Sequence, residues 1–249
     1  GDLLGGADLT LDLRVDPRTT VGRLAEHLGR LGVEFRWRTA VLGVERGTGG
    51  DAAVATTRGG IAADHVVVCV GHDLDHLLPD VAESVDLRRC ALQMALVDRP
   101  EGLRTHAAVL TATSMLRYEG MASLPGASAV RDELAADAPE LLRMDANVMF
   151  AERPDGTLLV GDSHTYDVTV DPFCEEWISE RLLAEVAAVL GVEGLRVRQR
   201  WQGVYAKSPD AGSHLRRRRD ETVTVVTMTT GTGMTLSFGI AAETLDGLG

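Results

Sequence analysis

A run of β-branched residues, Thr222-Val223-Thr224-Val225-Val226-Thr227, is followed closely by the glycine-rich segment Gly231-Thr232-Gly233-Met234-Thr235-Leu236-Ser237-Phe238. The run predicts a buried strand, and residues from about 235 to 245 predict a helix. A glycine-rich loop between a strand and a helix presents backbone N–H groups at the positive end of the helix dipole, where a ligand can approach closely. The loop signal alone is equally compatible with an ordinary tight turn.

The residues before position 84 also indicate an α/β arrangement. Asp16-Pro17 predicts a helix start, Val21, Leu24, Leu28 and Leu31 recur at helical spacing, and Gly32 predicts the C-terminal cap. Arg58-Gly59-Gly60 predicts a hairpin turn, and the apolar run 65–70 indicates a strand buried on both faces, as in a parallel sheet. The strands expected in this part are 34–37, 40–45, 53–57, 61–63 and 65–70.

The middle of the chain has a different pattern. Strands are expected at 87–97, 147–151, 157–161 and 197–203, and helices at 129–142 and 175–190. An α/β segment, an α+β insertion and a return to α/β predict two interleaved domains. We therefore expect an α/β fold divided into residues 1–83, 84–205 and 206–249, the middle part being built on a mainly antiparallel sheet.

Composition excludes several classes of function. The net charge of −12 argues against a nucleic-acid partner, and the Arg216–Arg219 run is expected to be a solvated loop beside Asp220 and Glu221, with an anion site as the alternative. No apolar run approaches the roughly 20 residues needed to cross a membrane. Cys69, Cys90 and Cys174 fit neither a disulfide framework nor a zinc site, so buried, reduced thiols and a cytoplasmic location are expected.

The glycine loop and two other segments resemble the flavin-contacting parts of the D-amino-acid-oxidase, glycine-oxidase and sarcosine-oxidase superfamily. The other two are Val15-Asp16-Pro17 with Gly32-Val33 and Thr39-Ala40-Val41, and residues 61–71. The resemblance implies a glutathione-reductase-type, Rossmann-like FAD domain with an inserted substrate domain. The FAD-binding positions that it implies are Val41, Val70, Gly71, Gly231, Gly233, Met234, Thr235, Leu236 and Ser237.

One part of the superfamily pattern is missing. A strand, a G-x-G-x-x-G turn and a helix normally seat the FAD pyrophosphate, and this sequence contains no such turn. We therefore expect an N-terminally incomplete FAD domain whose phosphate-binding part lies on a preceding or separate segment. The alternatives are a truncated, non-catalytic binding module and one subunit of a split flavoenzyme. Since the loop carries no cysteine, FAD is expected to bind noncovalently.

Within the middle part, Leu116–Glu119, Asp155–Leu158 with Gly161–Tyr166, and Arg200–Tyr205 resemble the flavin oxidoreductases that accompany organophosphonate breakdown. The resemblance implies oxidation of a small amine or amino acid, such as an aminophosphonate, by hydride transfer to the flavin. An arginine suits a phosphonate because its planar fork donates two hydrogen bonds. The substrate contacts that it implies are Arg117, Tyr118, His164, Arg200 and Tyr205.

Three of these substrate contacts have a structural alternative. His164 is as compatible with a hydrogen-bonded histidine in a turn, and for Tyr118 and Tyr205 aromatic packing is the safer interpretation. Asp162 and His164 provide too few ligands for a metal, and no nucleophile has the spacing of a hydrolase triad. No metal site is expected, and no catalytic acid or base is nominated.

Overall fold

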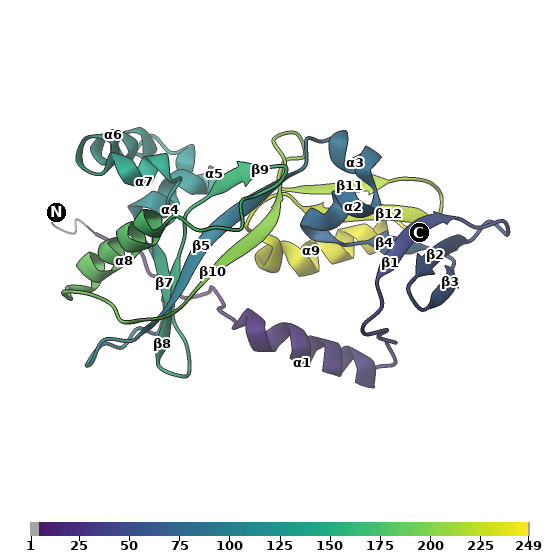
Figure 1. Cartoon of the computed structure of the whole chain (residues 1–249), viewed down its shortest axis with the longest axis horizontal. Coiled ribbons are helices and arrows are strands. Elements are labelled where there is room, and N and C mark those ends of the chain that lie inside the picture. Colours follow the sequence, from purple (N-terminus) through teal and green to yellow (C-terminus); the bar gives the residue numbers. More distant parts are fainter. Residues whose placement is uncertain (1–4, 249) are drawn as a thin grey trace.

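The computed structural model describes residues 5–248 and is shown in Figure 1. Its helices are α1 (Pro17–Arg30), the 3-10 helix η1 (Gly71–Asp73), α2 (Leu74–Leu77), α3 (Pro79–Glu83), α4 (Ala112–Arg117), α5 (Glu119–Ala122), α6 (Ala127–Asp137), α7 (Pro139–Arg143), α8 (Glu176–Leu190) and α9 (Gly233–Asp246). Its strands are β1 (Val41–Arg46), β2 (Ala52–Thr56), β3 (Gly59–Ala63), β4 (Val66–Val68), β5 (Arg88–Asp98), β6 (Ala108–Leu110), β7 (Met149–Glu152), β8 (Thr157–Gly161), β9 (Thr165–Asp167), β10 (Val197–Lys207), β11 (His214–Arg218) and β12 (Val223–Met228).

Helix α1 begins and ends where the sequence predicts. The Asp16 side chain accepts a hydrogen bond from the Arg18 backbone N–H (3.0 Å), and Pro17 is the first helical residue. Gly32 follows the helix with φ +98°, a conformation that glycine adopts without steric cost. The strand expected at 34–37 is wrong, because these residues pair with no strand and Phe35 and Trp37 instead stack on each other. No residue of α1 is buried.

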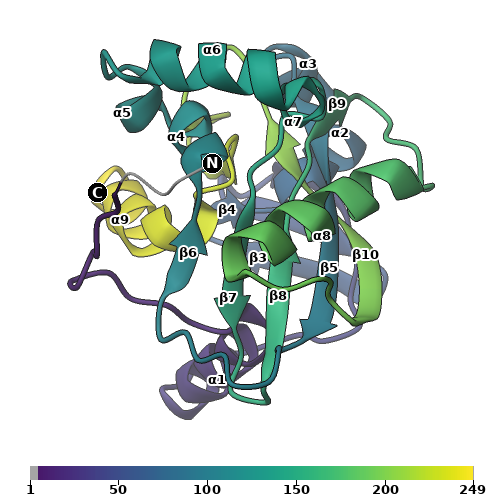
Figure 2. The same cartoon turned by 90° about the vertical axis from the view of Figure 1, so that its left-hand side faces the viewer.

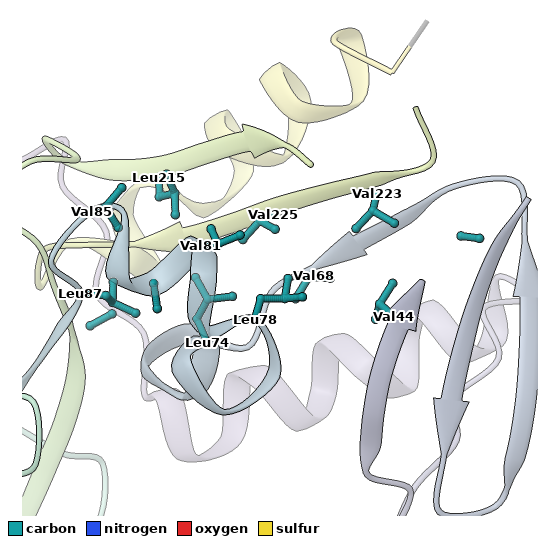
Figure 3. Close-up of a cluster of buried hydrophobic side chains, with 13 residues drawn as sticks. Val44, Val68, Leu74, Leu78, Val81, Val85, Leu87, Leu215, Val223 and Val225 are labelled. Carbon is teal, nitrogen blue, oxygen red and sulfur yellow. The ribbon is translucent and has the colours of Figure 1, made fainter. Parts of the chain in front are cut away.

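Strands β1, β2 and β3 form a small antiparallel sheet with the order β1-β2-β3. Beside it, β12 pairs in parallel with β4 and antiparallel with β11. Helices α2 and α3 contribute Leu74, Leu78 and Val81 to a shared core with Val68 and Val225, which Figure 3 shows. The run 65–70 thus has a parallel neighbour, as expected, and the structure identifies that neighbour as β12.

Three expectations from the sequence are wrong. Strand β4 is not buried on both faces: it is the end strand of its sheet, and Val67 is exposed, as is Cys69 just after it. Only Cys90 of the three cysteines is buried. The arginine run is not a loop, because residues 216–218 lie in β11. Its guanidinium groups are held by internal partners, such as Glu243 for Arg216 and the Val44 carbonyl for Arg219.

The larger sheet is antiparallel throughout, with the strand order β10-β5-β8-β7-β6 and with β9 paired to β5. Helix α8 covers one face of it (Figure 2) and buries Ile178, Leu182 and Val186 against Val97 and Leu158. The predicted helix over 129–142 is interrupted, since Pro139 cannot continue α6 and instead begins α7. Short elements α4, α5, β6 and β9 carried no sequence signal.

Strand β10 links the two regions. It pairs with β5 over its whole length, from Val197 to Lys207, and it also comes close to η1 and β12. The strand is four residues longer than the 197–203 expected, and it runs through the predicted boundary at 205. The division into 1–83, 84–205 and 206–249 stays a prediction. No helix within residues 5–248 has both the length and the apolar character required to cross a membrane.

Candidate flavin and substrate site

The glycine loop joins the end of β12 to the start of α9. Its first residues are anchored on the neighbouring turn, because the Thr229 hydroxyl donates to the Gly212 carbonyl (2.8 Å) and the Thr229 N–H to the Ser213 carbonyl (3.2 Å). The Thr230 and Thr232 hydroxyls lie 2.7 Å apart within the loop. The backbone that precedes α9 is therefore held in one conformation.

Close packing favours glycine at position 233, whereas a side chain at position 231 would make only ordinary van der Waals contact. A Cβ on Gly231 would lie 3.7 Å from the Tyr205 ring, and a Cβ on Gly233 would lie 3.2 Å from Met228 Cγ. Neither glycine has a positive φ. The loop thus brings its backbone directly onto the ring of Tyr205, a residue of β10.

The first turn of α9 is open to a ligand. Met234, Thr235, Leu236 and Ser237 are all exposed, Met234 by 52%. The N–H groups at the start of a helix have no partner within that helix, and the helix dipole favours negative charge there. The backbone N–H groups of this turn can therefore donate to the electron-rich edge of a planar ring. The Met234 and Leu236 side chains can pack against the same ring.

Beside the loop, Arg117 lies at the centre of a polar cluster. Arg117 Nη2 donates to the Tyr205 hydroxyl (2.8 Å), and Nη1 donates to Asp145 Oδ2 (2.7 Å) and to the Tyr166 hydroxyl (3.1 Å). The Tyr166 hydroxyl in turn donates to Asp145 Oδ2. These residues come from α4, the turn after α7, β9 and β10, so the tertiary fold alone assembles them.

The charges in this cluster are shifted by burial and by their neighbours. Burial alone would raise the pKa of Asp145, but the Tyr166 hydroxyl and the Arg117 charge hold that pKa below its usual value. Burial raises the pKa of Tyr205 and also that of Tyr166, so both phenols stay protonated at neutral pH. The cluster therefore contains one cation, one carboxylate and two neutral hydroxyl groups.

His164 and Asp162 extend the cluster into the protein interior. His164 Nδ1 lies 2.8 Å from the Asp145 carbonyl oxygen, and Nε2 lies 3.6 Å from Asp162 Oδ2. The side chains are 2% and 10% exposed, respectively. His164 is also 6.5 Å from the rings of Tyr166 and Tyr205, measured between centroids. Within the described residues, no group of three or more His, Cys, Asp or Glu side chains could hold a metal ion.

The remaining predicted residues lie in different places. Arg200 is outside the cluster, further along β10, and its Nη2 pairs with Glu176 (2.8 Å) on the surface. Tyr118 lies between α4 and α5 next to Arg117, where its backbone caps both helices. Val70 and Gly71 begin η1, beside β10 and β12, whereas Val41 begins β1 and is exposed. The sequence reasoning missed Asp145 and Tyr166, although Tyr166 lies in a segment that resembles the family.

Comparison with solved structures places this geometry in a class of folds. Glycine oxidase from Geobacillus kaustophilus has a TM-score of 0.63 at 18% identity, over 87% of this chain and 49% of that one. L-proline dehydrogenase from P. horikoshii has a TM-score of 0.67 at 14% identity, over 90% and 53%. L-alpha-glycerophosphate oxidase from Mycoplasma pneumoniae, solved with FAD bound, has a TM-score of 0.63 at 14% identity, over 90% and 54%. The class is that of flavin-dependent oxidoreductase folds, and the chain spans about half the length of these three proteins.

The family follows from the sequence itself. The family described as DAO, FAD dependent oxidoreductase, matches residues 2–246, and the chain therefore belongs to it. None of the curated proteins is significantly similar to the chain. The relation to glycine and amino-acid oxidases expected from the three sequence segments is confirmed, and the cofactor of the family is FAD.

The residues present fit one end of that cofactor. Gly231 and Gly233 lie near Tyr205 and Met228, respectively, and the first turn of α9 is exposed, as a surface for a flavin ring requires. For the pyrophosphate, by contrast, the sequence contains no G-x-G-x-x-G turn. The described chain thus matches the ring-facing part of an FAD site.

Proposed function

We propose that the chain is part of an FAD-dependent oxidoreductase that oxidises the C–N bond of a small amine or amino acid. In this proposal, residues 1–83 and 206–249 belong to a cytoplasmic, glutathione-reductase-type FAD domain, and residues 84–205 form the inserted substrate domain. The phosphate-binding part would lie on a segment outside this sequence, which is supported by the missing G-x-G-x-x-G turn. FAD would bind noncovalently, because no cysteine is present in the glycine loop.

The observation that carries the proposal is the position of Arg117. Its guanidinium binds the hydroxyl of Tyr205, and the ring of Tyr205 lies against Gly231 of the loop. An anion on Arg117 would therefore be held beside the first turn of α9. This geometry supports a role for Arg117 in binding a substrate carboxylate next to the surface that would hold the flavin ring.

Arg117 has hydrogen-bond donors left for such an anion. A guanidinium has five N–H bonds, and the contacts with Asp145, Tyr166 and Tyr205 use three of them. The Nε–H and one Nη2–H have no partner among the described residues, and two such donors match a carboxylate. Asp145 already neutralises part of the Arg117 charge, so a carboxylate fits this site more easily than the doubly charged phosphonate of an aminophosphonate.

The other residues have defined parts in the proposal. When bound, FAD accepts the hydride from the carbon next to the amine nitrogen. Val70 and Gly71, Gly231, Gly233 and the first turn of α9 would hold the ring end, and Val41 the adenine end. Tyr205 and Tyr166 would orient the anion on Arg117, and Tyr118 would line the same pocket. We nominate no acid or base that touches the substrate.

Anaerobic reduction of the flavin tests this proposal. The holoprotein is mixed with glycine, sarcosine, alanine of either hand or 2-aminoethylphosphonate, and the flavin absorbance is followed. We expect bleaching by at least one amino acid, and a larger Kd for the phosphonate. A flavoprotein that none of these amines reduces would contradict the proposed reaction, and preferential reduction by the phosphonate would contradict the assignment of a carboxylate.

The pair Arg117→Met and Arg200→Met locates the site. Because hydrogen bonds to charged groups contribute about 1.5–3 kcal/mol, Arg117→Met should raise the Kd for the substrate roughly ten- to a hundredfold. Arg200→Met, which removes an exposed arginine outside the cluster, should leave that Kd within about twofold. Thermal melting and flavin content serve as controls for folding. If the two substitutions changed the Kd equally, the proposal that Arg117 binds the substrate would be contradicted.

A further inference from the structure

Asp162 is a buried carboxyl group that the proposed reaction does not use. It follows β8 directly, its side chain is nine-tenths buried, and its Oδ1 atom has no hydrogen-bond partner among the described residues. A buried polar atom without a partner is costly, and its presence in a folded protein requires an explanation. The neighbouring contact of Oδ2 with His164 provides one.

The hydrogen bonds of His164 define its tautomer. A backbone carbonyl oxygen can only accept, so Nδ1 carries the hydrogen that is donated to the Asp145 carbonyl. In a neutral imidazole Nε2 then has a lone pair, and this lone pair faces Asp162 Oδ2 at 3.6 Å. Two lone pairs repel each other, whereas protonation of Asp162 removes this repulsion, and a small shift of the carboxyl toward Nε2 would let it donate a hydrogen bond.

The electrostatics of the cluster agree with this arrangement. Burial raises the pKa of Asp162 to about 7 and lowers the pKa of His164 to about 4. The ionisable groups that face this pair are Arg117, Asp145, Tyr166, Tyr205, Cys90 and Lys207. Between about pH 4 and about pH 7, Asp162 is therefore mostly protonated and the imidazole of His164 is mostly neutral.

We propose that Asp162 and His164 are positioning residues that hold Asp145, and through it Arg117, for the carboxylate of the substrate. The connection runs from the Asp162 carboxyl to Nε2, from Nδ1–H to the Asp145 carbonyl, and from the Asp145 carboxylate to the Arg117 guanidinium. Asp145 lies in a left-handed turn conformation (φ +46°) that aspartate adopts more readily than most residues, and its carbonyl oxygen is the group that His164 contacts. This inference rests on the proposed function.

The arrangement has a consequence for pH. When Asp162 loses its proton, the carboxylate favours a hydrogen on Nε2, and a neutral His164 then has none on Nδ1 to donate. The Asp145 carbonyl loses its partner, and the Asp145–Arg117 pair loses its support. Affinity for a carboxylate should therefore fall as the pH rises through the pKa of Asp162.

The tautomer of His164 can be measured without any reaction. The holoprotein is labelled with [15N]histidine, and the His164 signals are assigned from their loss in His164→Asn. We expect a neutral imidazole with hydrogen on Nδ1 below about pH 7, and a change of its 15N shifts across that pH that is absent in Asp162→Asn. An Nε2–H tautomer or an imidazolium at about pH 6 would overturn the inference.

Acetate binding tests the effect on Arg117, with acetate as a carboxylate that stays ionised between about pH 6 and about pH 8.5. In the wild-type holoprotein, the Kd for acetate measured by calorimetry should rise about three- to tenfold over this range. Asp162→Asn, whose amide can donate to Nε2 at every pH, should abolish that rise. The amide of His164→Asn can still reach the Asp145 carbonyl, so its Kd for acetate should stay within about threefold of the wild-type Kd. The Kd of His164→Leu should be more than about tenfold larger than that of wild type.

The outcomes separate the inference from the proposed function. A Kd that does not change with pH in wild type, or the same pH dependence in Asp162→Asn, overturns the positioning role while leaving the carboxylate site intact. A wild-type protein that binds no acetate contradicts the proposed carboxylate site, and the positioning role falls with it, whatever the tautomer. If His164→Leu does not fold, the tautomer of wild-type His164 and the acetate binding of Asp162→Asn and His164→Asn still test the positioning role.

Discussion

Helices α1 and α8 have nearly the same length, 14 and 15 residues, and opposite environments. Helix α8 buries Ile178, Ser179, Leu182, Val186 and Ala187, most of them against the larger sheet, whereas α1 buries no residue. Yet α1 has an apolar stripe as regular as that of α8, formed by Val21, Leu24, Leu28 and Leu31. In Figure 1 it lies beside the two regions rather than between layers.

The difference shows what an apolar stripe does and does not determine. Helix α1 is attached at its start by polar contacts: Arg153 Nη2 lies 3.1 Å from Asp16 Oδ2, and the Arg18 guanidinium lies 5.3 Å from the Trp201 ring centroid. Helix α8 is instead held by apolar packing along its length. Periodicity predicts a helix and its apolar face, but the surface that covers that face belongs to another part of the fold.

The largest effect should come from the packed helix. Leu182 is 3% exposed in the core beneath α8, and truncation of a buried leucine costs about 2–5 kcal/mol through lost burial and a cavity. Leu182→Ala should therefore lower the free energy of unfolding by that amount in urea denaturation. A loss below about 1 kcal/mol would mean that α8 is not packed as described.

The pH dependence of stability should reveal the two buried ionisable groups that follow β8, Asp162 and His164. The pKa of Asp162 is raised to about 7, so its contribution is lost as the pH rises from about 4 to about 7. The pKa of His164 is lowered to about 4, so its contribution is lost as the pH falls from about 6.5 to about 4. In wild type, these two contributions change the free energy of unfolding in opposite directions as the pH rises.

Substitution of Asp162 or of His164 shows the pH dependence that the other residue contributes. In Asp162→Asn, the free energy of unfolding should rise as the pH rises from about 4 to about 6.5. In His164→Asn, it should fall as the pH rises from about 4 to about 7. Each change should be at most about 1.4 kcal/mol per pH unit. Thermal or urea denaturation across this range provides the measurement. Parallel profiles for the two variants would contradict the assigned charge states.

An intermediate effect is expected at the start of α1. Asp16→Ala removes both the N-cap and the partner of Arg153, and loss of an N-cap costs about 0.5–2 kcal/mol. Hydrogen exchange of the α1 amides should accelerate accordingly. Asp16→Asn keeps the cap and loses the charge, so its α1 amides should exchange faster than those of wild type and more slowly than those of Asp16→Ala. Unchanged exchange in both variants would show that these contacts do not hold α1.

The smallest effect should come from the apolar face of α1. Leu24 is 40% exposed, so Leu24→Ala should change the free energy of unfolding of the 249-residue chain by no more than about 0.5 kcal/mol. This is the direct counterpart of Leu182→Ala, and the same urea denaturation measures it. A loss as large as that of Leu182→Ala would show that a further surface covers α1.

Local signals in the sequence determined several elements correctly. The cap at Asp16, the β-branched run that becomes β12, the glycine loop before α9 and the glycine that ends α8 each depend on residues close in the chain. The errors came where local patterns were compatible with two outcomes. Residues 34–37 have strand-like composition without a partner strand, and the arginine run forms a strand because β12 pairs with it.

The site was predicted only in part. Gly231, Tyr205 and Arg117 were each identified from segments that resemble the family, but nothing in the sequence indicated that the three would meet. Asp145 is a single aspartate in a turn, and no pattern distinguishes it from other acidic residues in loops. Its importance follows only from its contacts with Arg117, Tyr166 and His164.

The sequence by itself therefore determined the family, the cofactor class and the positions of most helices and strands. The tertiary structure alone decided which apolar faces are covered, as for α8, and which are not, as for α1. It also decided which of two predicted arginines lies beside the glycine loop. The physical reason is that caps, turns and periodicity act over a few residues, whereas burial and ion pairing join groups far apart in the chain, such as Arg117 and Tyr205.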